Sequence, residues 1–424
     1  MTHHVNRSLT GPAPEHLPGH LSISLWDFSW YTRAGDGEPY ADLAGVTAEA
    51  ASRGFTTVRI CAAPLLLYGE LGLDDLAADL EIEGMGAPSP GGFVGSRTRW
   101  YDVPGGYRVN LRERLFELLA AVRAAGMSVI LSSWEYQQSP AFAASPRWFE
   151  AIDQVPNDRR YALLADSWLR LLDDVTAAGY RDLIAMVEMH NEVDFSLLPP
   201  LAEGMPEVTR LAAAHPDLLV TASYGKPPHL SMYEVPESLG AGQFHVYCYG
   251  VLDALQDELD IRAAGEEGFP NPALAEMLRR DAPPLSEYGR AAEWKYRATV
   301  VSDRMLYGYD WIDVEAWDRW LHERVGDYRL MMRREVESRV IAVARWARFH
   351  QVPVVIGEGW VGYTPLHGDF EESEEGRALT EHGIRTALAE GVWGVVLGSN
   401  IAPHHPSWSL VDWQRAMNRL IAEA

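Results

Sequence analysis

Two glutamates close apolar runs that have the length and composition of buried β-strands. Glu192 lies near the end of LIAMVEMHNEVDF (183–195), and Glu358 lies near the end of VPVVIGEGW (352–360). In a parallel sheet the carboxyl ends of the strands meet on one face, so both acids are expected there. Two carboxyl groups facing one another at that face can cleave a glycosidic bond, one as acid/base and one as nucleophile.

The ends of the strand-like runs also carry hydrogen-bonding groups and aromatic rings with few positive charges, a set that suits sugar hydroxyls and sugar ring faces. The candidate substrate-binding residues are Asp27, Trp30, Arg59, Trp134, Glu135, Asn191, His245, Tyr247, Trp360 and Asn400.

Several of these candidates have a structural alternative. For the aromatic and histidine positions the alternative is ordinary core packing, and for Asp27 and Glu135 it is a role in holding loops. Glu188 shares strand parity with Glu192 and is expected to pair with a buried Arg or His. Arg59 could support catalysis or be the other half of that pair.

The elements that must position these residues alternate along most of the chain. Strand-like runs lie at 21–31, 55–62, 127–133, 183–195, 218–223, 243–249, 352–358 and 392–399. Helical patterns lie at 41–54, 111–125, 160–178, 205–214, 330–349, 378–390 and 413–422. Such alternation predicts an α/β fold with a closed (β/α)8 TIM barrel. A doubly wound open sheet is less favoured, because no Gly-rich phosphate turn follows the first strand.

The chain is expected to be a polar arm at 1–20 followed by one barrel domain at 21–424. Two connections, at 64–110 after the second strand and at 250–328 after the sixth, far exceed the usual length of about two to six residues. Both would rise over the face that carries the acids, which favours a pocket over an open cleft.

Composition excludes several functional classes. The 424 residues carry 36 basic and 60 acidic side chains, a formal charge of −24, which argues against nucleic acid or an anionic membrane as a partner. Cys61 and Cys248 are expected to be small buried hydrophobes. The acidic runs Glu371–Glu375 and Glu266–Glu267 are expected to be solvated loop. Without a signal peptide or a transmembrane run, a cytoplasmic location is expected.

No cofactor is predicted, and no metal site, because the histidines do not cluster at adjacent strand ends as metal-assisted hydrolysis would require. His190 and His245 lie in strand runs, whereas His404 and His405 lie in the loop after the last strand.

Four short motifs, in order along the chain, resemble those of the cellulase-type glycoside hydrolases, retaining (β/α)8 barrels with acids on strands four and seven. The motifs are Thr57-Val-Arg59-Ile60, Glu188-Met-His-Asn191-Glu192, His245-Val-Tyr247 and Pro353-Val-Val-Ile-Gly-Glu358. The resemblance spans roughly residues 21–415.

The resemblance implies a role for each matching residue. Glu192 would be the acid/base and Glu358 the nucleophile of a retaining β-glycosidase. Asn191 would hold the substrate 2-hydroxyl, and Arg59 and Tyr247 would contact Glu358. An arginine favours the ionised nucleophile, and the charge of Glu358 favours a protonated Glu192.

The chain departs from the family pattern at three places. Val193 stands where the family has Pro, Glu135 where it commonly has His, and Ser399-Asn400 where it has the strand-eight tryptophan. A degenerate sugar-binding barrel is therefore the alternative to a glycosidase for short β-linked glycosides. Transglycosylation by the same acids and a homo-oligomeric state stay open.

Overall fold

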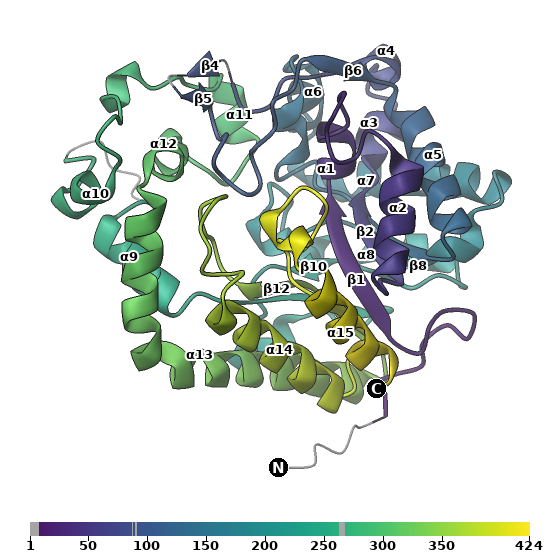
Figure 1. The fold of residues 1–424 in the computed structure, drawn as a ribbon. Coiled ribbons are helices and arrows are strands. Elements are labelled where there is room, and N and C mark those ends of the chain that lie inside the picture. Colours follow the sequence, from purple (N-terminus) through teal and green to yellow (C-terminus); the bar gives the residue numbers. More distant parts are fainter. Residues whose placement is uncertain (1–7, 87, 90, 263–267) are drawn as a thin grey trace.

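A computed structural model describes residues 8–86, 88–89, 91–262 and 268–424. Its main sheet has nine strand segments, all paired in parallel (Figure 1). They are β1 (Leu21–Asp27), β2 (Thr57–Cys61), β7 (Ser128–Ser132), β8 (Ile184–Glu188), β9 (Val220–Thr221), β10 (Ser223–Tyr224), β11 (Gly242–Cys248), β12 (Val354–Val361) and β13 (Gly394–Val396). Segments β9 and β10 flank Ala222 and occupy one position, so the order closes into the predicted eight-position barrel.

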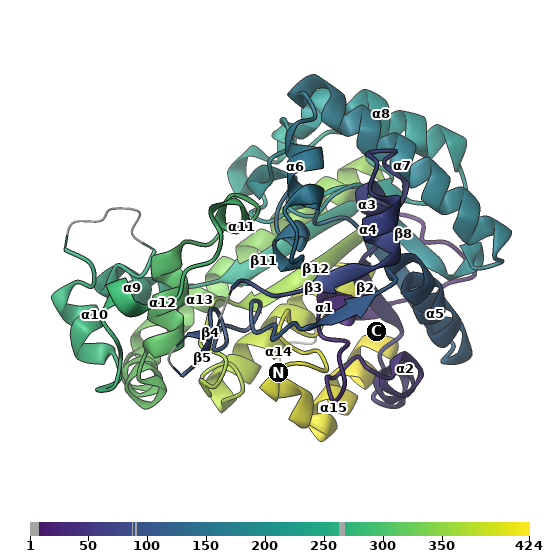
Figure 2. The same cartoon turned by 90° about the horizontal axis from the view of Figure 1, so that it is seen from above.

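Helices surround this barrel on the outside, as Figures 1 and 2 show. They are α2 (Leu43–Ser52), α5 (Leu111–Ala124), α7 (Asn157–Ala177), α8 (Leu201–Ala214), α13 (Val314–His350), α14 (Glu374–Ala389) and α15 (Val411–Ala422). In α5 the Asn110 side chain caps the first turn by accepting from the Glu113 N–H at 3.1 Å. One stripe of its side chains is buried against the barrel: Leu111, Leu115, Leu118, Leu119 and Val122.

Helix α13 differs from the sequence-based expectation. It runs for 37 residues and begins at Val314 rather than near residue 330. Asp313 caps it by accepting from the Ala316 N–H at 3.0 Å, and its added turns bury Trp317 and Leu321. The second insertion therefore ends at 313 and not at 328.

The two insertions carry short elements of their own. The first holds α3 (Pro64–Tyr68), α4 (Asp74–Ala78), β3 (Leu80–Ile82), β4 (Pro88–Ser89), β5 (Gly92–Phe93) and β6 (Tyr107–Val109). The second holds α9 (Val251–Leu259), α10 (Pro272–Met277), η5 (Leu285–Glu287), α11 (Glu293–Arg297) and α12 (Asp303–Trp311), and α9, α10 and α12 lie to one side of the barrel in both views. The remaining short helices are α1 (Ser29–Thr32), η1 (Ser139–Phe142), α6 (Arg147–Asp153), η2 (Arg181–Leu183), η3 (Val193–Phe195), η4 (His229–Glu234) and η6 (Pro406–Ser409).

Buried polar contacts join the insertions. Asp310 of α12 accepts the N–H groups of Gly95 at 2.7 Å and Arg97 at 2.9 Å, and Lys295 of α11 lies 2.9 Å from Glu83. These bonds satisfy backbone donors and a buried ammonium that would otherwise be costly to desolvate. The first and second insertions are therefore held together.

The N-terminal arm is not loose where the structure describes it. Thr10 is buried, and its Oγ1 donates to the Val352 carbonyl at 2.8 Å. The Trp393 Nε1 donates to the Pro18 carbonyl at 3.1 Å. Residues 8–20 thus pack against the barrel, and residues 1–7 lie outside the described part of the chain.

Two further expectations concern buried groups. Cys61 and Cys248 are free and buried, as predicted. Glu371 is not solvated: it is 8% exposed, and Nη1 of buried Arg99 lies 3.3 Å from its Oε2. Burial raises the pKa of Glu371 to about 7, against the opposing charge of Arg99. The other acidic run, Glu266–Glu267, lies outside the described residues.

Candidate active site

The two strand-end acids meet at the carboxyl end of the barrel. One carboxylate oxygen of Glu192, one of Glu358 and one ring nitrogen of His245 all lie within 4.8 Å of one another. The side chains of Glu192 and Glu358 are 17% and 11% exposed. Carboxyl groups this close can both reach one anomeric centre.

Arg59 of β2 organises one side of this site. Its guanidinium is fully buried and donates through Nη1 to Glu358 Oε1 at 2.7 Å. Its Nε and Nη2 donate to the two oxygens of Glu188 at 2.8 and 2.7 Å. Burial disfavours the charge of Arg59, but the two carboxylates outweigh it and raise the pKa of Arg59. Arg59 therefore holds one structural and one candidate catalytic carboxylate at once.

Glu188 is the structural half of that arrangement. Burial alone would raise the pKa of Glu188, yet the charge and hydrogen bonds of Arg59 keep that pKa below its ordinary value. Glu188 is thus ionised and fully enclosed, which agrees with the expected buried ion pair.

Glu192 has a different environment. It follows β8 with a φ of 43°, in the left-handed region that non-glycine residues seldom adopt, and its N–H donates to Ser223 Oγ at 2.8 Å. Its Oε2 accepts from Gln137 Nε2 at 2.7 Å, and its Oε1 lies 2.8 Å from His245 Nδ1. Burial raises the pKa of Glu192 to about 7, although the Gln137 hydrogen bond and Arg59 act against it. Glu192 can therefore hold a proton near neutral pH.

A short hydrogen-bond chain supports Glu358. Tyr247 OH donates to Glu358 Oε2 at 2.7 Å and also lies 2.7 Å from Ser399 Oγ. Ser399 Oγ accepts from the Gly359 N–H at 2.9 Å. Because the tyrosine proton goes to the carboxylate, the serine proton must go to the tyrosine. Both oxygens of Glu358 thus accept hydrogen bonds, one from Arg59 and one from Tyr247.

His190 holds the neighbouring loop in place. Its Nε2 accepts from the Tyr136 N–H at 3.0 Å, so its Nδ1 carries the proton and donates to the Asn191 carbonyl at 2.5 Å. Burial lowers the pKa of His190 to about 4, consistent with a neutral ring. His190 therefore anchors the loop after β7 to the end of β8.

Two residues at this site were not among the predicted substrate-binding residues. Gln137 lies in an irregular loop where no periodic pattern points to it, yet it contacts both Asn191 and Glu192. Ser399 ends the last strand-like run, and that position was the available signal for it. Its contact with Tyr247 could not be read from the sequence.

Asp27, at the end of β1, lies near the acids. Its φ is 36°, and its Oδ1 accepts from the Ser29 N–H at 2.5 Å. Burial raises the pKa of Asp27 to about 6, and the charge of Glu358 contributes in the same direction. Asp27 thus remains a candidate for contact with substrate.

Two other predicted substrate ligands have structural roles instead. Both oxygens of Glu135 accept backbone N–H groups at the start of α3, from Leu66 at 2.7 Å and Leu65 at 2.9 Å. Asn400 is fully buried, and its Nδ2 donates to Glu371 Oε2 at 2.8 Å. The two oxygens of Glu135 and the Nδ2 group of Asn400 are thus engaged by the protein itself, so both side chains have a structural role in place of the predicted contact with substrate.

The three predicted tryptophan platforms are buried. Trp30 donates through Nε1 to the Cys61 carbonyl at 3.0 Å, and Trp360 donates to the Val396 carbonyl at 3.2 Å. The Trp360 ring also packs against Gly383 of α14, and both rings are fully buried. Trp134 is 2% exposed, with the Arg59 guanidinium 4.5 Å from its ring centroid. Trp30 and Trp360 are core residues. The Trp134 ring packs against the guanidinium of Arg59 and has no exposed face for a sugar ring.

Within the described residues, one group of potential metal ligands is close enough to hold an ion, and it is Glu192, His245 and Glu358. Arg59 already lies 2.7 Å from Glu358, and a second cation there would meet its positive charge. The His404 ring is engaged elsewhere, with Ser29 at 3.1 Å and Tyr40 at 3.0 Å.

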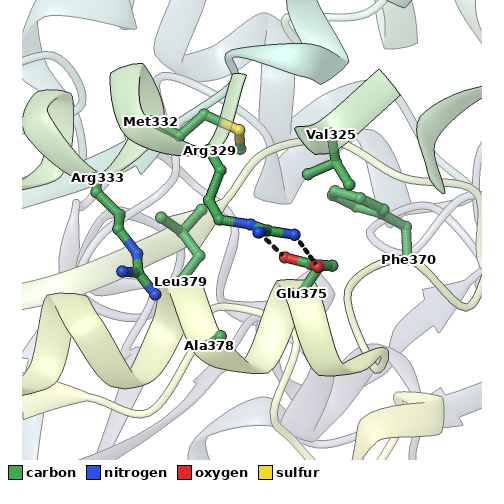
Figure 3. A pocket seen from close by; sticks show the side chains of 9 residues that line it. Val325, Arg329, Met332, Arg333, Phe370, Glu375, Ala378 and Leu379 are labelled. Atoms are coloured by element: carbon green, nitrogen blue, oxygen red, sulfur yellow. Dashed lines mark hydrogen bonds and ion pairs between the residues drawn. The ribbon is translucent and has the colours of Figure 1, made fainter. Parts of the chain in front are cut away.

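A small surface pocket lies between α13 and α14, apart from the acids (Figure 3). Arg329 of α13 pairs across it with Glu375 of α14, with Nε donating to Oε2 at 3.1 Å. None of its lining residues belongs to the site described above.

In the described chain, no helix has the length and hydropathy needed to span a membrane.

Comparisons with known proteins support this picture of the fold. A family model described as sugar-binding cellulase-like matches residues 23–220 and 288–422. A solved structure of a candidate glycoside hydrolase from Parabacteroides distasonis is 18% identical, with 95% of this chain and 94% of that chain covered and a TM-score of 0.66. A comparison with curated proteins gives no match.

Two further solved structures overlap more loosely. An endo-1,4-β-D-mannanase from Thermotoga petrophila is 14% identical, with 90% and 87% covered and a TM-score of 0.44. A broad-specificity endoglucanase from Clostridium longisporum is 13% identical, with 98% and 100% covered and a TM-score of 0.46. At these scores neither enzyme bears on the substrate of this chain.

Proposed function

The chain belongs to the cellulase-like family, and from this premise we propose that it is a retaining β-glycoside hydrolase for short β-linked glycosides. The observation that carries the proposal is that one carboxylate oxygen of Glu192 lies within 4.8 Å of one carboxylate oxygen of Glu358. Retaining glycosidases place their two carboxyl groups at roughly 5–5.5 Å, whereas inverting enzymes need about 6.5–9.5 Å to admit a water.

The proposed reaction proceeds in two balanced steps. In the first, a Glu358 oxygen bonds to the anomeric carbon, the glycosidic C–O bond breaks, and Glu192 gives its proton to the departing oxygen. In the second, Glu192 takes a proton from water, the water oxygen bonds to the anomeric carbon, and the ester to Glu358 breaks. No cofactor is needed for either step.

The electrostatics of the two acids support different roles. Glu358 accepts hydrogen bonds from Arg59 and Tyr247, which hold its two oxygens in place for attack on the anomeric carbon. Burial raises the pKa of Glu192 to about 7, as a general acid requires.

Four residues are proposed to contact the sugar: Asn191, His245, Tyr247 and Asp27. Asn191 Nδ2 donates one hydrogen to Gln137 Oε1 at 2.6 Å and has a second hydrogen for a substrate hydroxyl. Arg59 is proposed to act on Glu358 rather than on the sugar directly.

We further propose that residues 21–424 form one catalytic domain whose insertions wall off one end of the site, favouring exo action or short glycosides. The contacts of Asp310 with Gly95 and of Lys295 with Glu83 support that wall. Arg99 extends it to the loop after β12, with Nη1 2.6 Å from Glu372 Oε1. Internal cleavage of a long polysaccharide would contradict the wall.

A cytoplasmic location fits a substrate of short glycosides, and cell fractionation tests this location.

Product stereochemistry tests the retaining mechanism. With an aryl β-glycoside as substrate, proton NMR at early times should show the β-anomer of the free sugar before mutarotation. Initial release of the α-anomer would instead establish inversion. Products in which an added alcohol replaces water would indicate transglycosylation by the same two steps.

A sugar-binding barrel without turnover is the second candidate function. Ser399 stands where the family pattern has a tryptophan, and the acids are only slightly exposed. Saccharide binding measured by calorimetry, with no hydrolysis of any activated aryl glycoside, would favour this candidate.

A further inference from the structure

We propose that Gln137 is a positioning residue that fixes the reactive proton of Glu192 on Oε1. The proposal rests on the proposed function and deepens it, because it says which oxygen of the acid/base delivers the proton. Gln137 is 3% exposed and lies between the side chains of Asn191 and Glu192.

Donor and acceptor chemistry sets the orientation of every amide in this chain of contacts. A guanidinium only donates, so Arg59 Nη2, at 2.5 Å, must face the Oδ1 atom of Asn191. Asn191 therefore presents Nδ2 to Gln137, whose Oε1 accepts at 2.6 Å. Gln137 then presents Nε2 to Glu192, and Oε2 must accept at 2.7 Å.

The consequence for Glu192 follows directly. A proton on Oε2 would weaken that oxygen as the acceptor of the Gln137 N–H, so the protonated acid prefers to carry its proton on Oε1. That oxygen lies 2.8 Å from His245 Nδ1, and this nitrogen can accept a hydrogen bond from the protonated acid between turnovers. Arg59, which can only donate, thus determines through Asn191 and Gln137 which oxygen of Glu192 accepts a hydrogen bond.

The loop that carries Gln137 is held rigidly enough for this role. The N–H groups of Gln137, Gln138 and Ser139 all approach the Trp134 carbonyl, at 3.1, 2.8 and 3.1 Å. The Asn191 N–H donates to the Ser133 carbonyl at 2.8 Å, which ties the same loop to the end of β8. A side chain on such a support can hold a carboxyl group in one orientation.

The first test replaces Gln137 with methionine, which keeps the length of the side chain but removes its donor. Losing a hydrogen bond to the ionised form should move the alkaline limb of the kcat/KM profile upward by roughly 0.5–1 pH unit. The matched control is Gln138→Met, because Gln138 donates to Tyr101 OH at 3.2 Å and not to Glu192. An unchanged limb in Gln137→Met, with a normal melting temperature, would overturn the proposal.

A second readout uses leaving groups of different acidity. For Gln137→Met, kcat/KM should fall roughly 10–100-fold with alkyl or phenyl glycosides, whose departing oxygen needs the proton. It should fall much less with 2,4-dinitrophenyl glycosides, which leave without protonation. Equal losses on both classes would indicate general damage to the site and would count against a role in proton delivery.

Gln137→Glu keeps the volume but makes the donor titratable. When protonated, the new carboxyl can donate to Glu192 Oε2, whereas the ionised form repels it. Activity should therefore survive only on the acid side of the profile. A Gln137→Glu profile equal to that of the wild type would contradict the proposal.

A readout independent of turnover separates this inference from the proposed function. In protein labelled with ¹³C at the glutamate carboxyl carbons, the Glu192 signal is identified by its absence in Glu192→Gln. Its titration midpoint should be higher in Gln137→Met than in the wild type. If the enzyme hydrolyses no glycoside, the proposed function fails while this titration still tests Gln137, and an unchanged midpoint refutes the positioning role.

Discussion

The Nη1 atom of Arg59 lies 2.7 Å from Oε1 of Glu358, and the arginine side chain is fully buried in the barrel. The same guanidinium is bound on its other edge by both oxygens of Glu188. Arg59 is thereby fixed in direction as well as in charge, because a planar fork held on two sides cannot rotate. The orientation of Glu358 is consequently built into the core of the barrel.

Replacing Arg59 with methionine should destabilise the protein strongly. The change leaves Glu188 buried without its counter-charge, a loss worth about 3–5 kcal/mol in the free energy of unfolding. Denaturant unfolding measures it. Arg108→Met is the control, because Arg108 pairs with Asp79 on the surface, where a bridge is worth about 0–1 kcal/mol.

A compensating change tests the cause. In the double variant Arg59→Met with Glu188→Gln, Glu188 no longer carries an uncompensated buried charge, and only Glu358 is left without its arginine, so part of the lost stability should return. A double variant less stable than Arg59→Met alone would show that Glu188 is not the group left uncompensated.

The pH dependence of activity should show an alkaline limb near the pKa of Glu192, which burial raises to about 7. The first step needs a protonated Glu192, so kcat/KM should fall as the pH rises through that value. Glu192→Gln should lose this limb along with most activity toward glycosides with poor leaving groups. Rates on an activated aryl glycoside, measured from pH 5 to 9, provide the profile.

The same pKa makes a prediction about stability. A folded-state pKa raised from 4.5 to about 7 means that the folded protein holds the proton more tightly than the unfolded chain. The stability from this group is complete below about 4.5 and is lost as the pH rises through 7. Glu192→Gln should therefore have a larger free energy of unfolding than the wild type at pH 8, by at most roughly 3 kcal/mol. At pH 4 the two proteins should be equally stable.

Gly225→Ala should impair catalysis more than folding. A Cβ at residue 225 would lie 2.5 Å from Oε1 of Glu192 and 2.7 Å from the ring of Phe195. The carboxylate can swing away, so the fold survives, but a misplaced acid should cost about 10–100-fold in kcat/KM. Gly326→Ala is the control, since a Cβ there meets nothing within 4 Å. Full activity of Gly225→Ala would mean that the position of Oε1 does not matter.

The barrel and its strand-end acids could be predicted because apolar runs ending in polar residues are a local signal. Glu192, Glu358, Arg59 and His245 all belong to such runs, and parallel strands bring their ends together. Gln137 could not be found this way, because it lies in a loop whose path depends on His190 and on the end of β8.

Side-chain direction was the weaker part of the prediction. Trp360 shares alternation with Glu358, yet its ring lies under α14, where Gly383 leaves room for it. Glu135 follows a strand as a substrate ligand would, but the start of α3 takes both of its oxygens. In both cases a helix outside the local sequence pattern determines where the side chain points, so that pattern cannot predict its direction.

The nucleophile is the most direct test of the proposed mechanism, and Glu358→Ala with added azide measures it. An aryl β-glycoside should be turned over by the wild type, and the variant should lose at least about 10³-fold in kcat. Azide should restore turnover in the variant, with an α-glycosyl azide as product, and should not accelerate the wild type. Undiminished activity of Glu358→Ala, or a β-glycosyl azide as the rescued product, would contradict the assignment of Glu358 as the nucleophile of a retaining enzyme.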